Sequence, residues 1–272
     1  MDGGAGRWAE MTLVGFDTET TGLSVTEDRI FEVGMVSFEG GAVVDSYSRL
    51  IDPTRPLSQE SVAKTGVSDA DLHGKPAFQS IAAEVVARLE GRVVVGYNVL
   101  GYDLPLLENE LKRVGLAMPN CWPVDVLVFA RELVKGGRHN LGEMARQFGI
   151  AMETAHRATA DAEASVKLLL AMGPQLPPEL DALVRLQAQW REEQRARRAV
   201  WRQRQEGTGQ PEQLLRQETA PGASLVDDAG HVVLGPAYLY GREADPLRAF
   251  LATYTAQTGR PAAPRTDDLP TA

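Results

Sequence analysis

Residues 12–50 hold three consecutive strand-like runs, and this pattern limits the possible folds more than any other feature of the sequence. The runs are TLVGFDTE, RIFEVGMVSFEG and GAVVDSYSRLI, and the letters EGG at 39–41 mark a turn between the last two. Short runs of apolar and β-branched residues bounded by turn residues are typical of strands. Three such strands with short links predict an antiparallel meander.

From Ser58 onward the apolar residues recur at helical spacing instead. The segments SQESVAK and AFQSIAAEVVARLEG lead into the apolar run RVVVGYN, which is typical of a buried strand. Four further helical segments follow, DLPLLENELKRVG, VDVLVFARELV, NLGEMARQFG and ADAEASVKLLLAMG. A strand-rich start followed by alternating strands and helices predicts an α/β domain, with a mixed sheet covered by helices.

Composition limits location and binding mode. The single cysteine, Cys121, cannot form an intrachain disulfide, and the chain does not open on a basic segment followed by an apolar one, so we expect a cytoplasmic protein. No apolar run approaches the roughly 18 residues of a membrane span, so no membrane partner is expected. The net charge of −9 argues against a surface that binds nucleic acid over its whole extent. Any such binding must be local.

The prolines and the glycine of GPQLPPEL, at 173–180, mark a domain boundary. We expect a main domain over 8–173, an Arg-rich helix and linker over 174–210, a small appendage over 211–260 and a disordered tail over 261–272. The appendage holds a hairpin pattern, SLVDDAGHVVLG, and a short helix pattern, DPLRAFLATYTAQ. The C-terminal part is therefore expected to be an α+β appendage.

The first strand ends in GFDTETTGL, which places Asp17 and Glu19 two residues apart. Successive side chains of a strand alternate between faces, so both carboxylates point one way while Phe16 and Thr18 point the other way. Like charges at close range raise each other's pKa unless a cation intervenes, so the pair suits a metal ion. The alternative is that both acids are simply solvated at the end of the strand.

Two later segments supply further polar residues. Asp103 stands at the start of a helix that follows the second buried strand, with Asn98 in the connecting loop. His156 precedes Asp161 by five residues, which on one helix would separate them by about 140°. They form one site if His156 lies in a loop and Asp161 in the first turn of the helix, where small alanines let that turn approach the sheet. Alternatively, Asp103 is an N-cap, Asp161 interacts with the positive end of its helix, and His156 is structural.

These residues, in this order, resemble the histidine-containing branch of the DEDD superfamily of 3′→5′ exonucleases. That branch includes the proofreading epsilon subunit of bacterial replicative polymerase, ribonuclease T and oligoribonuclease. The first family motif is matched by FDTETTGL, and the third, H-x-A-x-x-D-A, by HRATADA at 156–162. The resemblance covers residues 12–172 and implies a ribonuclease H-like fold, a mixed five-stranded sheet flanked by helices.

The middle motif departs from the family pattern. Epsilon-type members read like H-N-x-x-F-D, whereas this chain reads YNVLGYD. Tyr97 stands in place of the histidine, and one extra residue separates Asn98 from Asp103. We assign the ligand role to Asp103 rather than to Asp125, which has no matching motif.

The resemblance and the ligand types together imply a metal-dependent hydrolysis. Four carboxylates offer only oxygen donors, which suits two ions of Mg²⁺ or Mn²⁺. The expected ligands are Asp17, which bridges the ions, Glu19, Asp103 and Asp161. His156 has an unperturbed pKa near 6.5, which suits a general base that takes a proton from the attacking water.

The same resemblance implies contacts with the terminal nucleotide. Residues directly after the first motif give Thr20 and Leu23 substrate roles, and Asn98 joins them from the middle loop. Leu23 could equally be a buried turn residue. The expected substrate is a nucleic acid with a 3′ end, single-stranded DNA, in proofreading or repair. The alternatives are an exoribonuclease, since the 2′-OH is recognised by pocket shape, and a non-catalytic partner-binding subunit.

The segment after residue 173 suggests partners. Four arginines at helical spacing predict a basic stripe that binds the substrate strand or a partner, with tryptophans beside it. These residues are Arg191, Arg195, Arg198 and Arg202, with Trp190 and Trp201. The alternative is a solvated helix whose arginines pair with neighbouring acids such as Glu192 and Glu193. The letters PEQLLRQ at 211–217 faintly resemble a sliding-clamp peptide, so a polymerase or a clamp is a possible partner.

Overall fold

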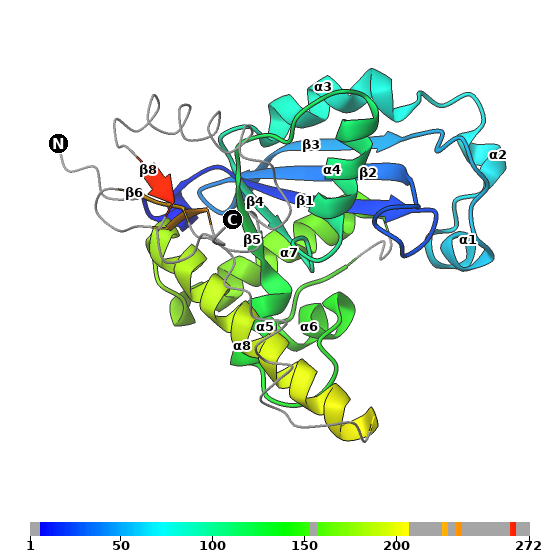
Figure 1. Ribbon diagram of the computed structural model, residues 1–272. Helices are drawn as coiled ribbons and strands as arrows, with labels where there is room; N and C mark the ends of the chain where they lie inside the picture. The colour runs from blue at the N-terminus through cyan, green and yellow to red at the C-terminus, as the bar shows by residue number, and fades with distance from the viewer. Residues whose placement is uncertain (1–5, 153–156, 207–224, 228–231, 235–261, 265–272) are drawn as a thin grey trace. The chain divides into compact units, whose positions relative to one another are not determined.

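The computed structural model of the chain, shown in Figure 1, describes most of the first 206 residues and three later strands. The described ranges are 6–152, 157–206, 225–227, 232–234 and 262–264. The chain divides into two compact units, Met1–Pro178 and Glu179–Ala272, which are described separately. His156 and the short helix expected at DPLRAFLATYTAQ lie outside the described residues.

A five-stranded sheet forms the centre of the first unit, with strand order β3-β2-β1-β4-β5. Its strands are β1 (Leu13–Thr20), β2 (Ile30–Glu39), β3 (Ala42–Leu50), β4 (Val93–Gly96) and β5 (Trp122–Asp125). The first three pair antiparallel, which confirms the predicted meander. Strands β4 and β5 run parallel to β1, so the sheet is mixed, as expected.

The sequence pattern did not predict strand β5. The segment VDVLVFARELV was expected to be helical throughout, but its first two residues complete β5, and the helix begins only at Val126. This strand has four residues and contains Pro123, and it lies at the edge of the sheet. Proline removes a backbone donor and is therefore tolerated mainly on edge strands. So short a strand shows no periodicity that could separate it from the helix that follows.

Seven α-helices are described in the first unit. They are α1 (Gln59–Thr65), α2 (Asp69–Leu72), α3 (Phe78–Leu89), α4 (Asp103–Arg113), α5 (Val126–Leu133), α6 (Leu141–Gln147) and α7 (Ala158–Met172). Helix α7 packs along β1 and β2 on one face of the sheet, and α3 and α4 cover the opposite face (Figure 1). The layers enclose fully buried side chains such as Phe16, Phe31 and Phe129, whose removal from water stabilises the fold.

The second unit begins with a long helix, as the sequence predicts. Helix α8 runs over Leu180–Glu206. Strands β6 (Leu225–Asp227) and β7 (Val232–Leu234) pair antiparallel, as expected of the hairpin pattern, and β8 (Ala262–Pro264) pairs with β6 within the expected tail. None of the described helices is long and apolar enough to cross a membrane.

Candidate active site

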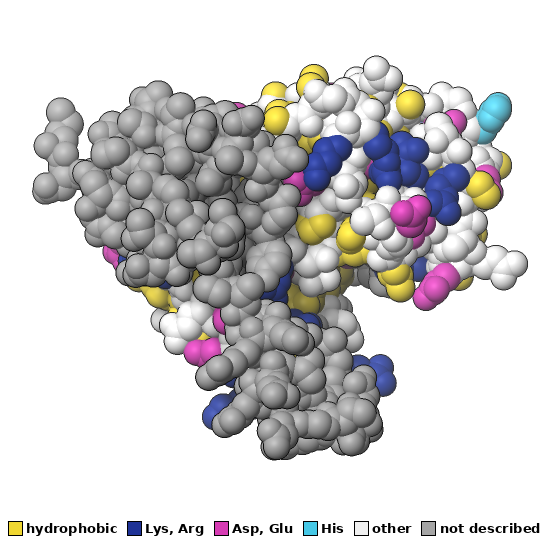
Figure 2. All heavy atoms as spheres, in the orientation of Figure 1, with side chains coloured by type: hydrophobic (Ala, Val, Ile, Leu, Met, Phe, Trp, Pro, Cys, Tyr) yellow, Lys and Arg dark blue, Asp and Glu magenta, His cyan; other side chains and the backbone are white. Residues whose placement is uncertain are grey.

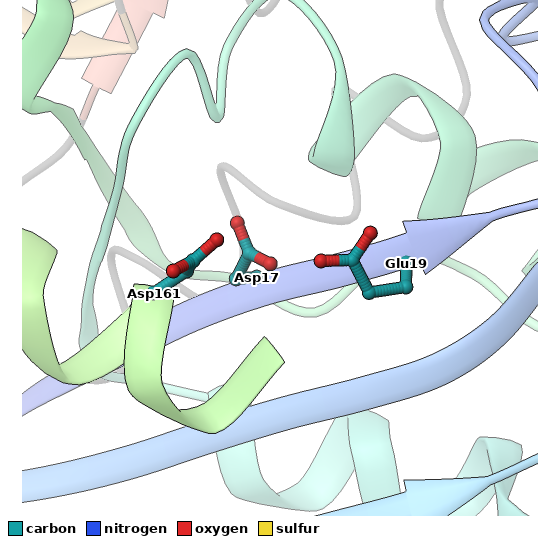
Figure 3. A group of neighbouring side chains, drawn as sticks. All are labelled: Asp17, Glu19 and Asp161. Carbon is teal, nitrogen blue, oxygen red and sulfur yellow. The ribbon is translucent and has the colours of Figure 1, made fainter. Parts of the chain in front are cut away.

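Three carboxylates meet at the end of β1. Asp17 and Glu19 come from β1 itself, and Asp161 comes from the first turn of α7. One carboxylate oxygen of each residue lies within 4.8 Å of those of the other two. Figure 3 shows Asp17 between the other two side chains, on the side of β1 that meets α7. Strand alternation thus places the two acids of β1 on one face, and the helix adds the third.

Two glycines allow α7 to approach the sheet this closely. Gly34 is the partner of Asp17 across β1 and β2. A Cβ atom at Gly34 would collide with the backbone of Ala158, and a Cβ atom at Gly15 would collide with the backbone oxygen of Ala162. Both alanines are fully buried, which agrees with the expected close approach of this turn. The sheet glycines that complete the contact were not identified from the sequence.

The N-terminus of α7 fixes where Asp161 lies. Arg157 is the N-cap, the helix begins at Ala158, and the backbone N–H of Asp161 donates to the carbonyl of Arg157. Asp161 is therefore in the first helical turn. The residue before the N-cap, His156, is not among the described residues, and its place in a preceding loop stays a prediction.

Asp103 lies beside the three carboxylates but does not belong to their group. It is the first residue of α4, after the N-cap Tyr102, so the alternative that Asp103 is an N-cap is wrong. Its Oδ1 accepts hydrogen bonds from Thr18 N (3.1 Å) and Thr18 Oγ1 (2.8 Å). The pairing of β1 with β4 ends at Gly15 and Val95, so beyond that point this aspartate takes the place of a neighbouring strand along β1.

Burial and mutual repulsion make these acids hard to ionise. The pKa of Asp17 lies well above its usual value, first because of burial and then because of the charges of Asp103 and Asp161. Burial raises the pKa of Glu19 to about 7, against the opposing effect of the Lys64 ammonium. Burial likewise raises the pKa of Asp103 to about 7. Ionising Asp17, Glu19 and Asp103 together therefore requires added positive charge.

The side chains present fit a divalent cation. Oxygen atoms of carboxylates are the ligands that Mg²⁺, Mn²⁺ and Ca²⁺ prefer. Among the described residues, Glu19 Oε1 has no hydrogen-bond partner although it is buried. A buried acceptor without a donor costs stability, and a bound cation would satisfy it. The arrangement therefore suits a metal held by Asp17, Glu19 and Asp161.

Comparison with known proteins gives the family. The model of a protein family described as "Exonuclease" matches residues 14–169, which is more than half of the chain. The chain belongs to the exonuclease family. The match begins within β1 and ends within α7, so it includes all three carboxylates of the cluster.

Curated relatives of this exonuclease include much longer proteins. The DNA polymerase III PolC-type of Lacticaseibacillus paracasei is 35% identical over 165 residues, which are 60% of this chain and 11% of the relative. The PolC-type polymerase of Thermotoga maritima is 32% identical over 164 residues, 60% of this chain and 12% of the relative. The chain thus spans about a tenth of the length of these relatives.

Solved structures share the fold at lower identity. A structure of exonuclease I matches with a TM-score of 0.57 and 18% identity over 63% of this chain and 42% of that one. Escherichia coli exonuclease I in complex with a dA16 oligonucleotide matches with a TM-score of 0.56 and the same identity and coverage. A complex of exonuclease I with the C-terminal segment of SSB gives 0.55 at 16% identity, covering 63% and 43%. These likenesses establish the fold alone.

Leu23 of the exonuclease domain is strongly exposed. The residue is 83% accessible to solvent, so the alternative of a buried turn residue is wrong. Thr20, the residue directly after Glu19, is buried, and its Oγ1 donates to the carbonyl of Gly22 at 2.8 Å. Because Leu23 itself is not buried, other contacts must hold the loop that carries it.

Those contacts come from polar groups on both sides of the segment 21–29, which we call the Leu23 loop. Asp28 accepts hydrogen bonds from Thr21 Oγ1 and Ser24 N. Side chains of α4 and the residue before it donate to three carbonyls of the loop. These bonds run from Tyr102 to Gly22, from Asn109 to Val25 and from Arg113 to Thr26. The loop is therefore fixed to α4 and displays Leu23 close to the end of β1.

Asn98 and Asp125 shape the loop that leads to α4. Asn98 is exposed and has a φ of 68°, a left-handed conformation that asparagine tolerates better than most residues. Asp125 is the N-cap of α5, and its carboxylate accepts the N–H groups of Asn98 (2.9 Å), Leu100 (3.2 Å) and Leu127 (3.1 Å). Backbone donors thus occupy Asp125, which is expected to shape the loop rather than bind a metal.

The irregular middle motif has a structural counterpart. Tyr97, which stands where the family motif has histidine, donates its hydroxyl proton to the carbonyl of His139 at 2.8 Å. Burial raises the pKa of this phenol, so it stays protonated. The tyrosine therefore connects the loop before α4 to the segment before α6.

A half-buried ion pair next to the carboxylates was also not identified from the sequence. Glu32 lies opposite Glu19 in the pairing of β2 with β1, and its side chain is fully buried. The Arg157 guanidinium donates to it through Nε and Nη2, at 3.1 and 3.0 Å. This pair connects β2 to the N-cap of α7, the helix that carries Asp161. The available signal was an arginine inside HRATADA and one acid within an apolar strand.

Proposed function

We propose that the chain is a metal-dependent 3′→5′ exonuclease of the histidine-containing DEDD branch. It removes nucleoside monophosphates from the 3′ end of single-stranded DNA, in replication proofreading or in repair. The observation that carries this proposal is the convergence of Asp17, Glu19 and Asp161 within 4.8 Å. The similarity to PolC-type DNA polymerases supports DNA over RNA as the substrate.

The proposed ligands are the three clustered carboxylates and Asp103, and the proposed cofactor is two ions of Mg²⁺ or Mn²⁺. Such ions stabilise the negative charge on the attacking and leaving oxygens of a phosphoryl displacement. Asp103 reaches the site with one oxygen already bound to Thr18, so its orientation is set by β1. Asp17, central in the cluster, is the proposed bridging ligand.

His156 is the proposed general base. Its imidazole takes a proton from the attacking water as the new bond from water oxygen to phosphorus forms. The bond between phosphorus and the 3′ oxygen of the preceding nucleotide breaks, and the terminal nucleotide leaves as a 5′-monophosphate. His156→Ala is expected to retain metal affinity and to lose 10²- to 10⁴-fold in turnover, the usual range for general-base assistance.

Thr20, Leu23 and Asn98 are the proposed contacts with the terminal nucleotide. Leu23 offers an apolar surface to a base, and its exposure on a fixed loop supports this role. Basic side chains also gather locally on this unit: Arg29 and Arg113 contact Glu110, and Arg55 donates to the carbonyl of Glu27. Figure 2 shows Lys and Arg side chains grouped on the visible face of the first unit, although the chain is acidic overall.

Residues 8–173 are the proposed catalytic domain, and the remainder is proposed to bind the substrate strand or a polymerase or clamp. In α8, Arg195 is exposed and lies 4.0 Å from Glu192, which fits the solvated-helix alternative. Arg197 approaches Glu193 at 3.7 Å. The side chains of Trp201 and Arg202 are outside the described part of the chain.

Matched DNA and RNA strands labelled at the 5′ end test the proposal. With Mg²⁺ or Mn²⁺ we expect a ladder of DNA products that shorten from the 3′ end, and none in the presence of chelator. Faster degradation of RNA would favour the exoribonuclease alternative. Full activity in chelator, or no product with either ion from a folded protein, would contradict the proposed mechanism.

A further inference from the structure

Helix α1 brings a cation to the carboxylates that no motif of the sequence indicated. Lys64 Nζ lies 3.2 Å from Glu19 Oε2. Its positive charge acts on Asp17 and Asp161 as well, since both carboxylates favour the charged form of this lysine. In the metal-free protein, Lys64 therefore supplies part of the positive charge that the cluster requires.

The lysine is held in place by its helix. Ser61 Oγ donates to the carbonyl of Thr20 at 2.9 Å, which attaches α1 to the end of β1. Ser58 caps the N-terminus of α1, and Gly66 ends it with a φ of 72°. The backbone that carries Lys64 is therefore fixed, because Lys64 lies one helical turn after Ser61, the residue that attaches α1 to β1.

Lys64 also lies at the boundary between the cluster and solvent. Half of its side chain is exposed, whereas the side chain of Glu19 is only 4% exposed. An ammonium has three N–H donors, and Glu19 is its one hydrogen-bond acceptor among the described residues. Donors therefore remain for a ligand that enters from solvent.

A metal ion and Lys64 compete for the same carboxylate. A divalent ion held by Glu19 would weaken the bond from this carboxylate to the ammonium and repel the ammonium itself. The freed ammonium would lie beside an incoming phosphodiester, and lysine is a common point-charge binder of phosphate. The negative charge of the phosphodiester would then balance the positive charge that the metal ion brings to the site.

We propose that Lys64 exchanges partners on loading: it binds Glu19 in the empty site and the phosphate of the last linkage of the nucleic acid when metal occupies Glu19. Lys64 is thus a substrate-binding residue outside the three sequence motifs. This role rests on the proposed exonuclease function.

The first measurement is metal binding without nucleic acid. Lys64→Gln should bind Mn²⁺ several-fold more tightly than the wild type in titration calorimetry, because the competing cation is gone from Glu19. Lys64→Arg should resemble the wild type. Lys167→Gln is the matched control, since Lys167 pairs with Glu163 on the surface of α7 and loses the same charge. Weaker Mn²⁺ binding by Lys64→Gln would overturn the exchange.

The second measurement locates the phosphate. Metal-saturated proteins are titrated against two labelled DNA strands that resist hydrolysis at the last linkage, one with a charged phosphorothioate and one with a neutral methylphosphonate. Lys64→Gln should weaken binding of the charged strand roughly three- to tenfold, as one half-exposed charged hydrogen bond would. The salt slope should fall by about 0.7. The same substitution should leave binding of the neutral strand nearly unaffected. The methylphosphonate already lacks the charge that the Lys64 ammonium would bind, so the substitution has no further interaction to remove.

Two outcomes distinguish failure of the Lys64 role from failure of the exonuclease function. Equal losses on both strands, or no loss on either, would overturn the role of Lys64 while leaving the exonuclease function in place. Failure of the wild-type protein to bind either strand would overturn the proposed function and the role of Lys64 with it.

Discussion

The carboxylate cluster and the Leu23 loop lie close together at the end of β1, but different interactions hold them in place. The cluster forms where α7 packs directly on glycines of the sheet, and it leaves buried like charges with too few partners. The Leu23 loop is tied by hydrogen bonds from Asp28 and α4, and it leaves an apolar side chain in water. The difference is that a bound cation would relieve repulsion in the cluster, whereas hydrogen bonds within the protein already hold the Leu23 loop.

The largest effect is expected from removing one charge of the cluster. Asp161→Asn should abolish nearly all nuclease activity and metal binding. The metal-free variant should nevertheless be more stable than the wild type and unfold at a higher temperature. Its free energy of unfolding should be larger by on the order of 1 kcal/mol, because one buried repulsion is gone. Thermal unfolding in chelator and calorimetric metal titration check this. A metal-free variant less stable than the wild type would show that the cluster does not store repulsion.

Filling the space under α7 tests the packing side of the comparison. Gly34→Ala places a methyl group against the backbone of α7, which cannot move as a flexible side chain could. We expect a loss of about 3 kcal/mol in urea unfolding, the upper part of the range for overpacking. Gly142→Ala in α6 is the control, because its Cβ would meet only ordinary contacts and a helix favours alanine. Equal stability of Gly34→Ala and the wild type would contradict the close approach.

The pH dependence follows from the raised pKa values of the acids. When the pKa of an acid is higher in the folded state, the folded protein binds more protons than the unfolded one. The free energy of unfolding therefore falls as pH rises from the unfolded pKa to the folded pKa. For Glu19 this window extends from 4.5 to about 7. In chelator we expect the free energy of unfolding to fall by about 1 to 3 kcal/mol between pH 5 and pH 8. Saturating Mg²⁺ or Mn²⁺ should remove the fall; a rise with pH in chelator would refute it.

The smallest effect is expected in the Leu23 loop. Leu23→Ala should change the free energy of unfolding by less than about 0.5 kcal/mol, because the side chain is already in water. It should raise the KM for a DNA strand several-fold, since about 1 kcal/mol of apolar contact with a base is lost. Leu116→Ala, at another exposed leucine, is the control for KM and should leave it unchanged. An unchanged KM would separate Leu23 from the substrate.

Periodicity was sufficient for most of the fold. The meander, the long helices and the shared face of Asp17 and Glu19 follow from alternation and helical spacing, which are local properties of the chain. Strand β5 does not, because four residues containing Pro123 are too short to show a period. Its existence depends on pairing with β4, which is a property of the assembled sheet.

The residues of the candidate site likewise fall into those that local sequence patterns indicate and those that only the assembled fold brings together. Motifs indicated the acids, since their spacing is short or matches a family pattern. Lys64, Gly34 and the pair of Glu32 with Arg157 join segments far apart in the sequence, and each looks ordinary in its own segment. Their roles appear only when the sheet and α7 are assembled, because each acts through a neighbour that sequence spacing does not specify.

The position of Asp103 has a consequence for the entropy of ligand binding. One of its oxygens already holds two donors of Thr18, so the carboxylate cannot rotate freely before a ligand arrives. A side chain that is ordered in advance loses little conformational freedom when it binds. Among the acids at the end of β1, Asp103 is thus fixed by the strand itself, and the chain has already met the cost of orienting it during folding.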